Sequence, residues 1–344
     1  MPARPRSKEN TFKDSPEKSR PDDKLNIRTV LAPIDLSAAS MQALNYAVPI
    51  AERFQADLHL VYVHENSHEF STESMSQLLH DIAKMRTSVE SAPQSGPTRL
   101  IRAENCHVLI GRAYQKACDL AGELTADLIV LATRGQTGLA RVLLGSTAER
   151  IVQFAPCPVL VTRQRKRPEQ TGGVERTPGQ FGFAPRRILV PVDFSQCSLA
   201  GVKYAALFAK AFDAKLRLFH TLFPPNPVVM DRISANLSGE WDQTRRMNAQ
   251  LEMEALMQLD FLRGVTCETE IRAGYAIQEI CAEIERANVD LVITSTHGQT
   301  GIKHALLGSV AEHVVRYAEC PVLVVPSGAR GKARSDKSQE TPGF

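Results

Sequence analysis

An internal repeat constrains the fold of this chain more than any other feature of its sequence. Residues 135–161 read GQTGLARVLLGSTAERIVQFAPCPVLV and residues 298–324 read GQTGIKHALLGSVAEHVVRYAECPVLV, so they share 17 of 27 positions. Unrelated segments would share only about one or two. Upstream, residues 30–37 (VLAPIDLS) match residues 188–195 (ILVPVDFS). The period is that of a domain, so the chain carries one domain twice.

Two offsets relate equivalent positions of the copies: 158 between Asp35 and Asp193 (193 − 35), and 163 between Gly135 and Gly298 (298 − 135). We expect a first copy at residues 25–164 and a second copy at residues 185–327. The stretch 165–184, rich in Pro and Gly, is expected to be a linker. The polar ends, 1–24 and 328–344, are expected to be disordered tails.

Short apolar runs alternate with helical patterns in each copy. Strands are predicted at 29–33, 57–63, 105–110, 127–132 and 159–162, and their counterparts begin near residues 187, 215, 267, 290 and 322. Helices are predicted at 38–54, 72–91, 112–123 and 147–155, with a longer one at 233–262. This alternation predicts an α/β fold in which helices cover both faces of a parallel sheet. The methionine and leucine stripes of 72–91 and 233–262 are expected to face the core.

Composition excludes several classes of protein. The formal net charge of +3 is too small for a nucleic-acid binder. No apolar run is long enough to cross a membrane, and the polar N-terminus has no secretory signal pattern. Seven cysteines without CxxC spacing fit neither a disulfide framework nor a zinc site. We therefore expect a cytoplasmic protein that binds neither membrane nor nucleic acid.

A loop after the fourth strand of each copy is a candidate phosphate-binding segment. It runs from Gly135 to Gly145-Ser146 in the first copy and from Gly298 to Gly308-Ser309 in the second. Glycines let the backbone approach a ligand closely, and the N-terminus of the following helix favours an anion. Asp35 and Asp193 end the first strands, at the same edge of each sheet.

A purely structural interpretation of the same residues is open. Ser146 with Glu149, and Ser309 with Glu312, have the S-x-x-E spacing of a capping box. The serines would then cap helices and the glycines would only make turns.

The P-x-D-x-S strand end, the G-x9-G-S loop and the closing CPVLV strand, found twice in order, resemble the universal stress protein family. The resemblance covers residues 26–163 and 186–327. It implies a doubly wound, Rossmann-like sheet of five parallel strands in the order 3-2-1-4-5. In members that bind ATP, it implies a site between strands one and four.

The resemblance also assigns roles to residues of both copies. Asp35 and Asp193 would contact the adenosine, and Val63 and Thr221 would line the adenine pocket. The phosphates of ATP, with or without Mg²⁺, would lie on the loop and helix start. The loop and helix-start candidates are Gly135, Gly145, Ser146 and Thr147 in the first copy, and Gly298, Gly308, Ser309 and Val310 in the second.

Both copies depart from the nucleotide-binding form of the motif, G-x2-G-x9-G-[ST]. Ala132 and Ser295 stand where that form has its first glycine. Arg134 of the first copy is matched by His297 in the second. Arg134 could add a cation near the phosphates or face solvent, and His297 could respond to pH or serve as an ordinary loop residue.

Three functions are compatible with these motifs. The first is an ATP-binding stress-response regulator without strong catalysis. The second is an interaction scaffold that binds no nucleotide, which the absent first glycines favour. The third is a slow ATP hydrolase, although no Walker, nucleophile-elbow, zinc or kinase motif occurs.

The last strand of each copy is a candidate for assembly. These strands are apolar and begin after Pro158 and Pro321. An apolar edge strand invites pairing with another edge. We expect the two strands to pair within one chain, or between chains to form a homodimer.

Overall fold

The structure is a computed structural model that describes residues 24–65, 102–133, 144–163, 183–223, 235–298 and 307–326. The first copy contains β1 (Thr29–Ile34), α1 (Ala38–Phe54), β2 (Asp57–His64), the 3-10 helix η1 (Ala103–Asn105), β3 (Cys106–Ile110), α3 (Ala113–Glu123), β4 (Leu128–Ala132), α4 (Ser146–Phe154) and β5 (Val159–Thr162). The second contains β6 (Arg187–Pro191), α5 (Gln196–Phe212), β7 (Lys215–Leu222), α7 (Ala235–Met257), the 3-10 helix η2 (Asp260–Leu262), β8 (Cys267–Ala273), α8 (Ala276–Arg286), β9 (Leu291–Ser295), α9 (Ser309–Tyr317) and β10 (Val322–Val325).

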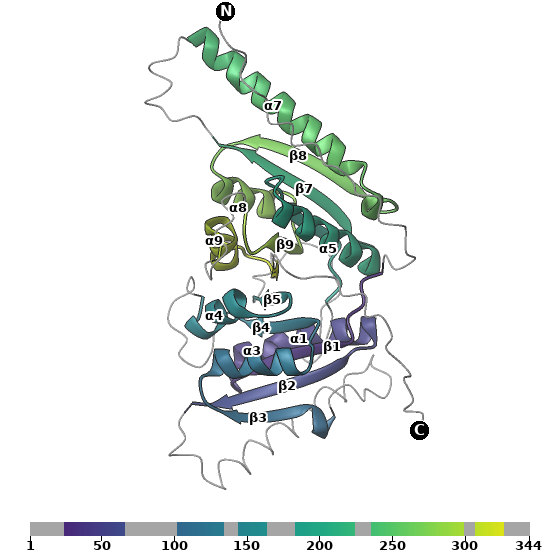
Figure 1. The fold of residues 1–344 in the computed structure, drawn as a ribbon, viewed down its shortest axis with the longest axis vertical. Coiled ribbons are helices and arrows are strands. Elements are labelled where there is room, and N and C mark those ends of the chain that lie inside the picture. The colour runs from purple at the N-terminus through teal and green to yellow at the C-terminus, as the bar shows by residue number, and fades with distance from the viewer. Residues whose placement is uncertain are drawn as a thin grey trace, which may run out of the picture.

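The described strands form one ten-stranded sheet in the order β3-β2-β1-β4-β5-β10-β9-β6-β7-β8. Within each copy the paired strands are parallel, in the order 3-2-1-4-5, so the predicted fold class is confirmed. At the centre, β5 and β10 are antiparallel, with Leu160 opposite Leu323. The two copies therefore continue one another across a single sheet, as Figure 1 shows.

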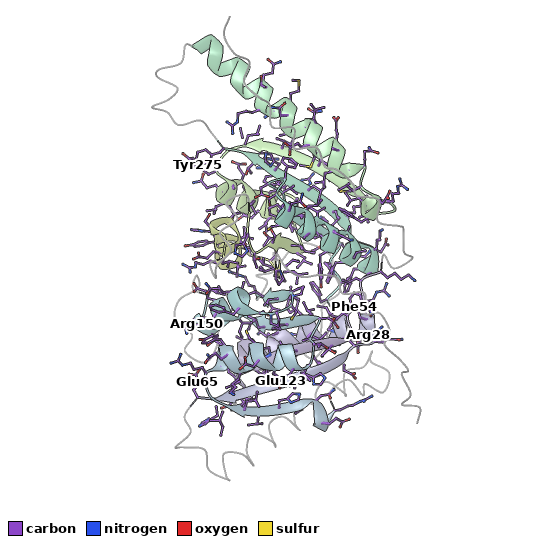
Figure 2. All side chains as sticks on the ribbon, viewed as in Figure 1. Arg28, Phe54, Glu65, Glu123, Arg150 and Tyr275 are labelled. Atoms are coloured by element: carbon purple, nitrogen blue, oxygen red, sulfur yellow. The ribbon has the colours of Figure 1, made fainter. Side chains whose placement is uncertain are left out.

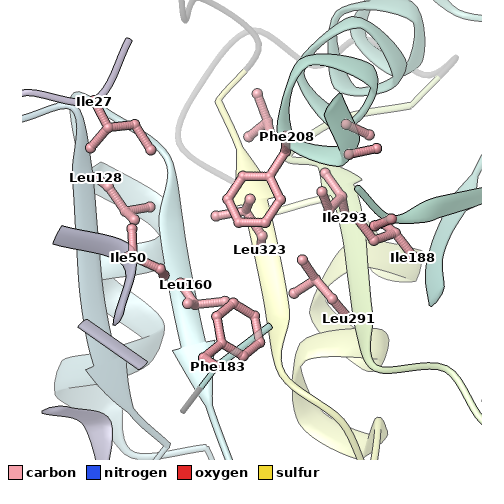
Figure 3. Packing of buried hydrophobic residues seen from close by; sticks show 14 of the residues in the cluster. Ile27, Ile50, Leu128, Leu160, Phe183, Ile188, Phe208, Leu291, Ile293 and Leu323 are labelled. Atoms are coloured by element: carbon pink, nitrogen blue, oxygen red, sulfur yellow. The ribbon is translucent and has the colours of Figure 1, made fainter. Parts of the chain in front are cut away.

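The hydrophobic core also continues from one copy into the other. The cluster beneath α1 and α5 contains Ile50 and Leu160 of the first copy together with Phe208 and Leu323 of the second. Figure 3 shows these side chains converging on the central strands. The cluster on the opposite face, beneath α3, α4, α8 and α9, likewise draws on both copies. Burial of this shared apolar surface is the main force that holds the copies together.

Polar and aromatic contacts reinforce this interface. Arg53 at the end of α1 donates a hydrogen bond of 2.6 Å to the carbonyl oxygen of Ala211 in α5. The ring of Phe54 lies edge-on to that of Phe212, with centroids 5.9 Å apart. On the other face, Arg316 of α9 lies 3.7 Å from Glu149 of α4. Both faces of the central strands are thus fixed.

The long helix of the second copy differs from its prediction. It ends at Met257, and a separate 3-10 helix follows. The expectation that its stripe faces the core is wrong for Met247 and Leu251, which are each 57% exposed, and holds for the buried Met253. Helix α7 contacts β7 and β8, the two outermost strands of this copy. One face of the helix therefore packs on the sheet, and another face, which carries Met247 and Leu251, stays exposed to solvent. The predicted helix 72–91 lies outside the described residues.

A fully buried carboxylate organises the outer part of the second copy. Glu283 of α8 is 0% exposed and binds Arg217 of β7, Arg272 of β8 at 3.3 Å, and Arg286 at 2.7 Å. Leu120 occupies the equivalent position of the first copy (283 − 163). The charge is therefore a special feature of the second copy, and it links the edge strand β8 and its neighbour β7 to the helix that covers them.

We predict that Glu283→Gln lowers the free energy of unfolding by about 3 kcal/mol, because it removes the buried anion that three partly exposed guanidinium groups share. Urea unfolding followed by circular dichroism measures the change. Glu268→Gln is the matched control, since Glu268 also binds Arg217, at 3.2 Å, but is 56% exposed. The control should cost less than about 1 kcal/mol. Equal losses in both variants would contradict the importance of the buried carboxylate.

The first copy has a histidine pair at the corresponding edge. His59 Nδ1 of β2 and His107 Nε2 of β3 lie 3.0 Å apart, so one ring nitrogen must donate and the other accept. Burial lowers the pKa of His59, the charge of His107 lowers it further, and Asp57 opposes both effects. Burial also lowers the pKa of His107, against the opposing charge of Glu123.

Both histidine pKa values are lower in the folded chain than in the unfolded chain, so folding favours the neutral form of the pair. The contribution of the pair to stability is complete above the pKa of about 6.5 that histidine has in the unfolded chain. It is lost as the pH falls through the lowered pKa values of the folded chain. We expect the urea midpoint to drop between pH 7.5 and pH 5.5. The drop should be smaller in a His59→Gln, His107→Gln double variant, and an unchanged drop would show that the pair does not contribute to it.

Candidate functional site

The turn that follows the first strand of each copy is built around an aspartate. Asp35 Oδ1 accepts a hydrogen bond of 3.0 Å from the Ser37 N–H, and Asp193 Oδ1 accepts the same bond from Ser195. The residue in between, Leu36 or Phe194, has a φ of 62°. Non-glycine residues with positive φ are uncommon and cluster at functional sites. Both copies therefore hold a strained turn at the carboxyl edge of the sheet.

In the second copy, the structure brings Asp193 together with two of the predicted loop glycines. A Cβ added to Gly298 would lie 2.5 Å from Asp193 Oδ2, so only glycine leaves room for the carboxylate. The Gly308 N–H donates to the Thr296 carbonyl oxygen at 2.7 Å, and this bond draws the far end of the loop back to β9. A Cβ on Gly308 would lie 3.8 Å from the Gly298 nitrogen.

The first copy repeats the part of this arrangement that the structure describes. The Gly145 N–H donates to the Thr133 carbonyl oxygen at 2.8 Å, as Gly308 does to Thr296. Gly135 and Arg134 lie outside the described residues. The hydrogen bond made by Gly145 thus matches the one made by Gly308 in the second copy.

The capping-box interpretation is wrong in both copies. The residues that cap α4 and α9 are Gly145 and Gly308, and neither cap has a side-chain hydrogen bond. Ser146 and Ser309 are the first residues inside the helices. The backbone N–H groups of the first helical turn have no acceptor within a helix. As far as the described residues go, these two helix starts are therefore available to an anion, and Thr147 and Val310 lie within the same first turn.

The residues in place of the first glycine face the helix that covers the sheet. A Cβ added to Gly201 of α5 would lie 3.7 Å from the Ser295 Cβ, so the missing side chain at 201 makes room for the serine. The Ser295 hydroxyl donates to the His297 carbonyl oxygen at 2.9 Å. In the first copy, Ala132 is matched by Ala43 at the equivalent position of α1 (201 − 158). In the second copy, the departure from glycine is thus accommodated by packing on α5.

Val63 and Thr221 lie on the neighbouring strand, level with the aspartates. In the parallel register, Pro33 pairs with Val61 and Pro191 pairs with Phe219. Two residues further along, Asp35 is level with Val63 and Asp193 with Thr221.

One neighbour of the site was not predicted from the sequence. His220 Nδ1 lies 2.7 Å from the Val192 carbonyl oxygen, and its ring lies 4.5 Å from that of Phe194. These aromatic side chains flank Asp193, and Leu36 and Tyr62 take their places in the first copy (194 − 158 and 220 − 158). The signal that could have found them is this difference between the aligned copies. The other histidine of the region, His297, bonds to the hydroxyl of Thr296 at 2.9 Å.

Two cavities of the described residues lie away from the candidate site. A cavity of about 350 Å³ lies between α7 and β8, and one of about 320 Å³ lies beside α3; neither is lined by a candidate site residue. In the described parts of the chain, no cluster of three His, Cys, Asp or Glu side chains is placed to hold a metal ion. Burial raises the pKa of the Cys157 thiol to about 12, which favours a packing role over a reactive one.

Comparison with known proteins identifies the family. The sequence model of the Universal stress protein family matches residues 26–163 and 185–326. The chain belongs to the universal stress protein family.

Individual relatives agree with this assignment. A universal stress protein of Methanocaldococcus jannaschii is 34% identical over 143 residues, which cover 41% of this chain and 81% of that protein. One from Mycolicibacterium smegmatis is 23% identical over 320 residues, covering 86% of this chain and 96% of the relative. A crystal structure of a universal stress protein from Archaeoglobus fulgidus has a TM-score of 0.56 at 18% identity and covers 89% of this chain and 98% of that one. This last likeness supports the fold alone.

The caps of the universal stress protein fold can be tested by matched serine substitutions. Ser37 and Ser195 are true caps, since their side chains accept from the N–H groups of Ser40 and Ser198. We predict that Ser37→Ala or Ser195→Ala costs about 1 kcal/mol of unfolding free energy. Ser146→Ala or Ser309→Ala should cost less than about 0.5 kcal/mol. Thermal unfolding measures all four variants, and a loss at Ser309 as large as that at Ser195 would restore the capping box.

Proposed function

We propose that this protein is an adenine-nucleotide-binding regulator, with ATP as the ligand and without strong catalysis. The observation that carries the proposal is the pair of helix starts at α4 and α9. Each has glycine as its cap, no side-chain hydrogen bond at the cap and a serine as its first residue. Such a helix start favours a phosphate, because its N–H groups and the helix dipole both attract an anion.

The surrounding residues of the second copy fit a nucleotide. Asp193 lies against Gly298, and Gly308 closes the loop beside them. We assign Asp193 to the ribose, because a carboxylate accepts hydrogen bonds from hydroxyl groups. We assign Thr221, one strand away, to the lining of the base. In the first copy we assign the same roles to Asp35, Val63, Gly135, Gly145, Ser146 and Thr147.

A regulatory role is favoured over a catalytic one by the chemistry of the site. Strong catalysis requires a positioned nucleophile, base or metal. Among the described residues, the helix starts proposed for the phosphates offer backbone N–H groups and serine hydroxyls, which can bind and orient an anion, and we assign the nearby Asp193 carboxylate to the ribose. Nucleotide binding at the two helix starts would then alter the surface that partners meet.

The cellular setting and the assembly are part of the proposal. All seven cysteines are free, which favours a reducing compartment such as the cytoplasm. In the described part of the chain, no helix combines the length and apolarity needed to cross a bilayer. We propose that the pairing of β5 with β10 persists in solution, so that one chain acts as an intramolecular pair. Homodimerisation would add to this pair.

Nucleotide content is the first test of the proposal. Protein purified without added nucleotide is denatured, released small molecules are identified by mass spectrometry, and the emptied protein is titrated with ATP by calorimetry. We predict adenine nucleotide at one or two per chain. Ser309→Asp and Ser146→Asp place a negative charge at each helix start. Each should weaken ATP binding in its own copy about ten-fold or more.

The aspartate variants distinguish loss of the binding site from loss of the folded structure. A carboxylate at the first helical position stabilises the helix by about 0.5 kcal/mol, so thermal stability should be kept or raised. Ser309→Ala, which removes the hydroxyl without adding charge, is the matched control. ATP binding that is unchanged in both aspartate variants would contradict the assigned site. An emptied protein that binds no ATP would favour the interaction scaffold.

A further inference from the structure

An exposed pair of aromatic rings stands at the carboxyl edge of the second copy. Phe223 directly follows β7, and Tyr275 directly precedes α8. Their ring centroids are 5.2 Å apart and the planes are nearly perpendicular, at 89°. The Gly274 N–H donates to the Leu222 carbonyl oxygen at 3.0 Å, and this bond joins the two segments. Figure 2 shows Tyr275 at this end of β8.

These rings are unusually open to solvent for large apolar side chains. Phe223 is 58% exposed and Tyr275 is 50% exposed. An edge-to-face pair uses the face of one ring and the edge of the other, so further ring surface is left for another aromatic group. Apolar surface grouped at the edge of a candidate site is typical of ligand contacts.

The first copy has charged residues at both equivalent positions, Glu65 (223 − 158) and Arg112 (275 − 163). The backbone is the same there, since the Gly111 N–H donates to the His64 carbonyl oxygen at 2.9 Å. Glu65 Oε1 accepts from the Ala113 N–H at 3.1 Å and so satisfies the start of α3. Both positions therefore differ between the copies: the first copy has a polar cap there, and the second has a pair of aromatic rings.

The position of the pair matches the reach of a nucleotide. Strands β9, β6, β7 and β8 are successive neighbours, so the ends of β9 and β8 are about 14 Å apart at the usual strand spacing. The helix start proposed for the phosphates follows β9, and the rings follow β7 and β8. Thr221, level with Asp193, lies between them. A nucleotide laid across this edge directs its base toward the rings.

We propose that Phe223 and Tyr275 stack on the purine base of a nucleotide bound to the second copy. The second copy then holds both base and phosphates, whereas the first copy holds the phosphates without this stacking and binds more weakly. This inference rests on the proposed function and assigns the base contact that distinguishes the two sites.

The test removes the rings and compares two probes, ATP and inorganic triphosphate, by calorimetry. In a Phe223→Ala, Tyr275→Ala double variant, ATP binding at the tighter site should weaken about ten-fold or more, because stacking on aromatic side chains is lost. Triphosphate, which has no base, should bind as it does to the original protein. Tyr317→Ala is the control, since Tyr317 is 45% exposed but lies at the far end of α9.

A transplant provides the reciprocal test. Glu65→Phe with Arg112→Tyr should tighten ATP binding at the weaker site several-fold and leave triphosphate binding unchanged. ATP affinity that stays constant when the rings are removed would overturn the stacking proposal while leaving nucleotide binding intact. If the original protein binds neither ATP nor triphosphate, the proposed function is overturned, and the stacking proposal with it.

Discussion

The antiparallel pairing of β5 with β10 is the interaction on which the rest of the structure depends. Each strand has four residues, all of them buried, and begins just after a proline. Left alone, each would be a short apolar edge open to any other strand. Paired, they join two sheets and make two core clusters to which both copies contribute. The remaining edges, β3 and β8, are more exposed, and β8 carries Glu268, Glu270 and Arg272.

The candidate site of the second copy depends on a second constraint, the limited space beside the Asp193 carboxylate. Gly298 is needed because the Asp193 carboxylate occupies the volume that a Cβ would fill. The loop glycine and the strand-end aspartate are therefore one structural unit, although more than a hundred residues separate them. The glycine caps of α4 and α9 add a helix start without a side-chain acceptor. Together these features make a place where an anion can approach backbone N–H groups beside a carboxylate.

The sequence predicted the elements well where periodicity was strong, and α1 begins and ends where it was expected. It failed where the answer depends on neighbours distant in the chain. Spacing alone could not tell whether Ser146 is a cap or the first helical residue. The exposure of Met247 follows from the position of α7 over the outermost strands, which no local pattern reports. The arginines around Glu283 come from β7, β8 and α8, so this cluster exists only in the folded chain.

Fusion of two copies in one chain removes a constraint that a symmetric dimer must obey. In a homodimer, identical residues line both sites, so any change at one site appears at the other. Here the central strands remain nearly the same, VLVT and VLVV, because each must fit the other. Away from this seam the copies differ: Leu120 stands where the other has Glu283, and Glu65 where the other has Phe223. These differences lie on the outer part of each copy, away from the central strands. Two sites on one continuous sheet can in this way differ in affinity without any change to the contact that holds the sheet together.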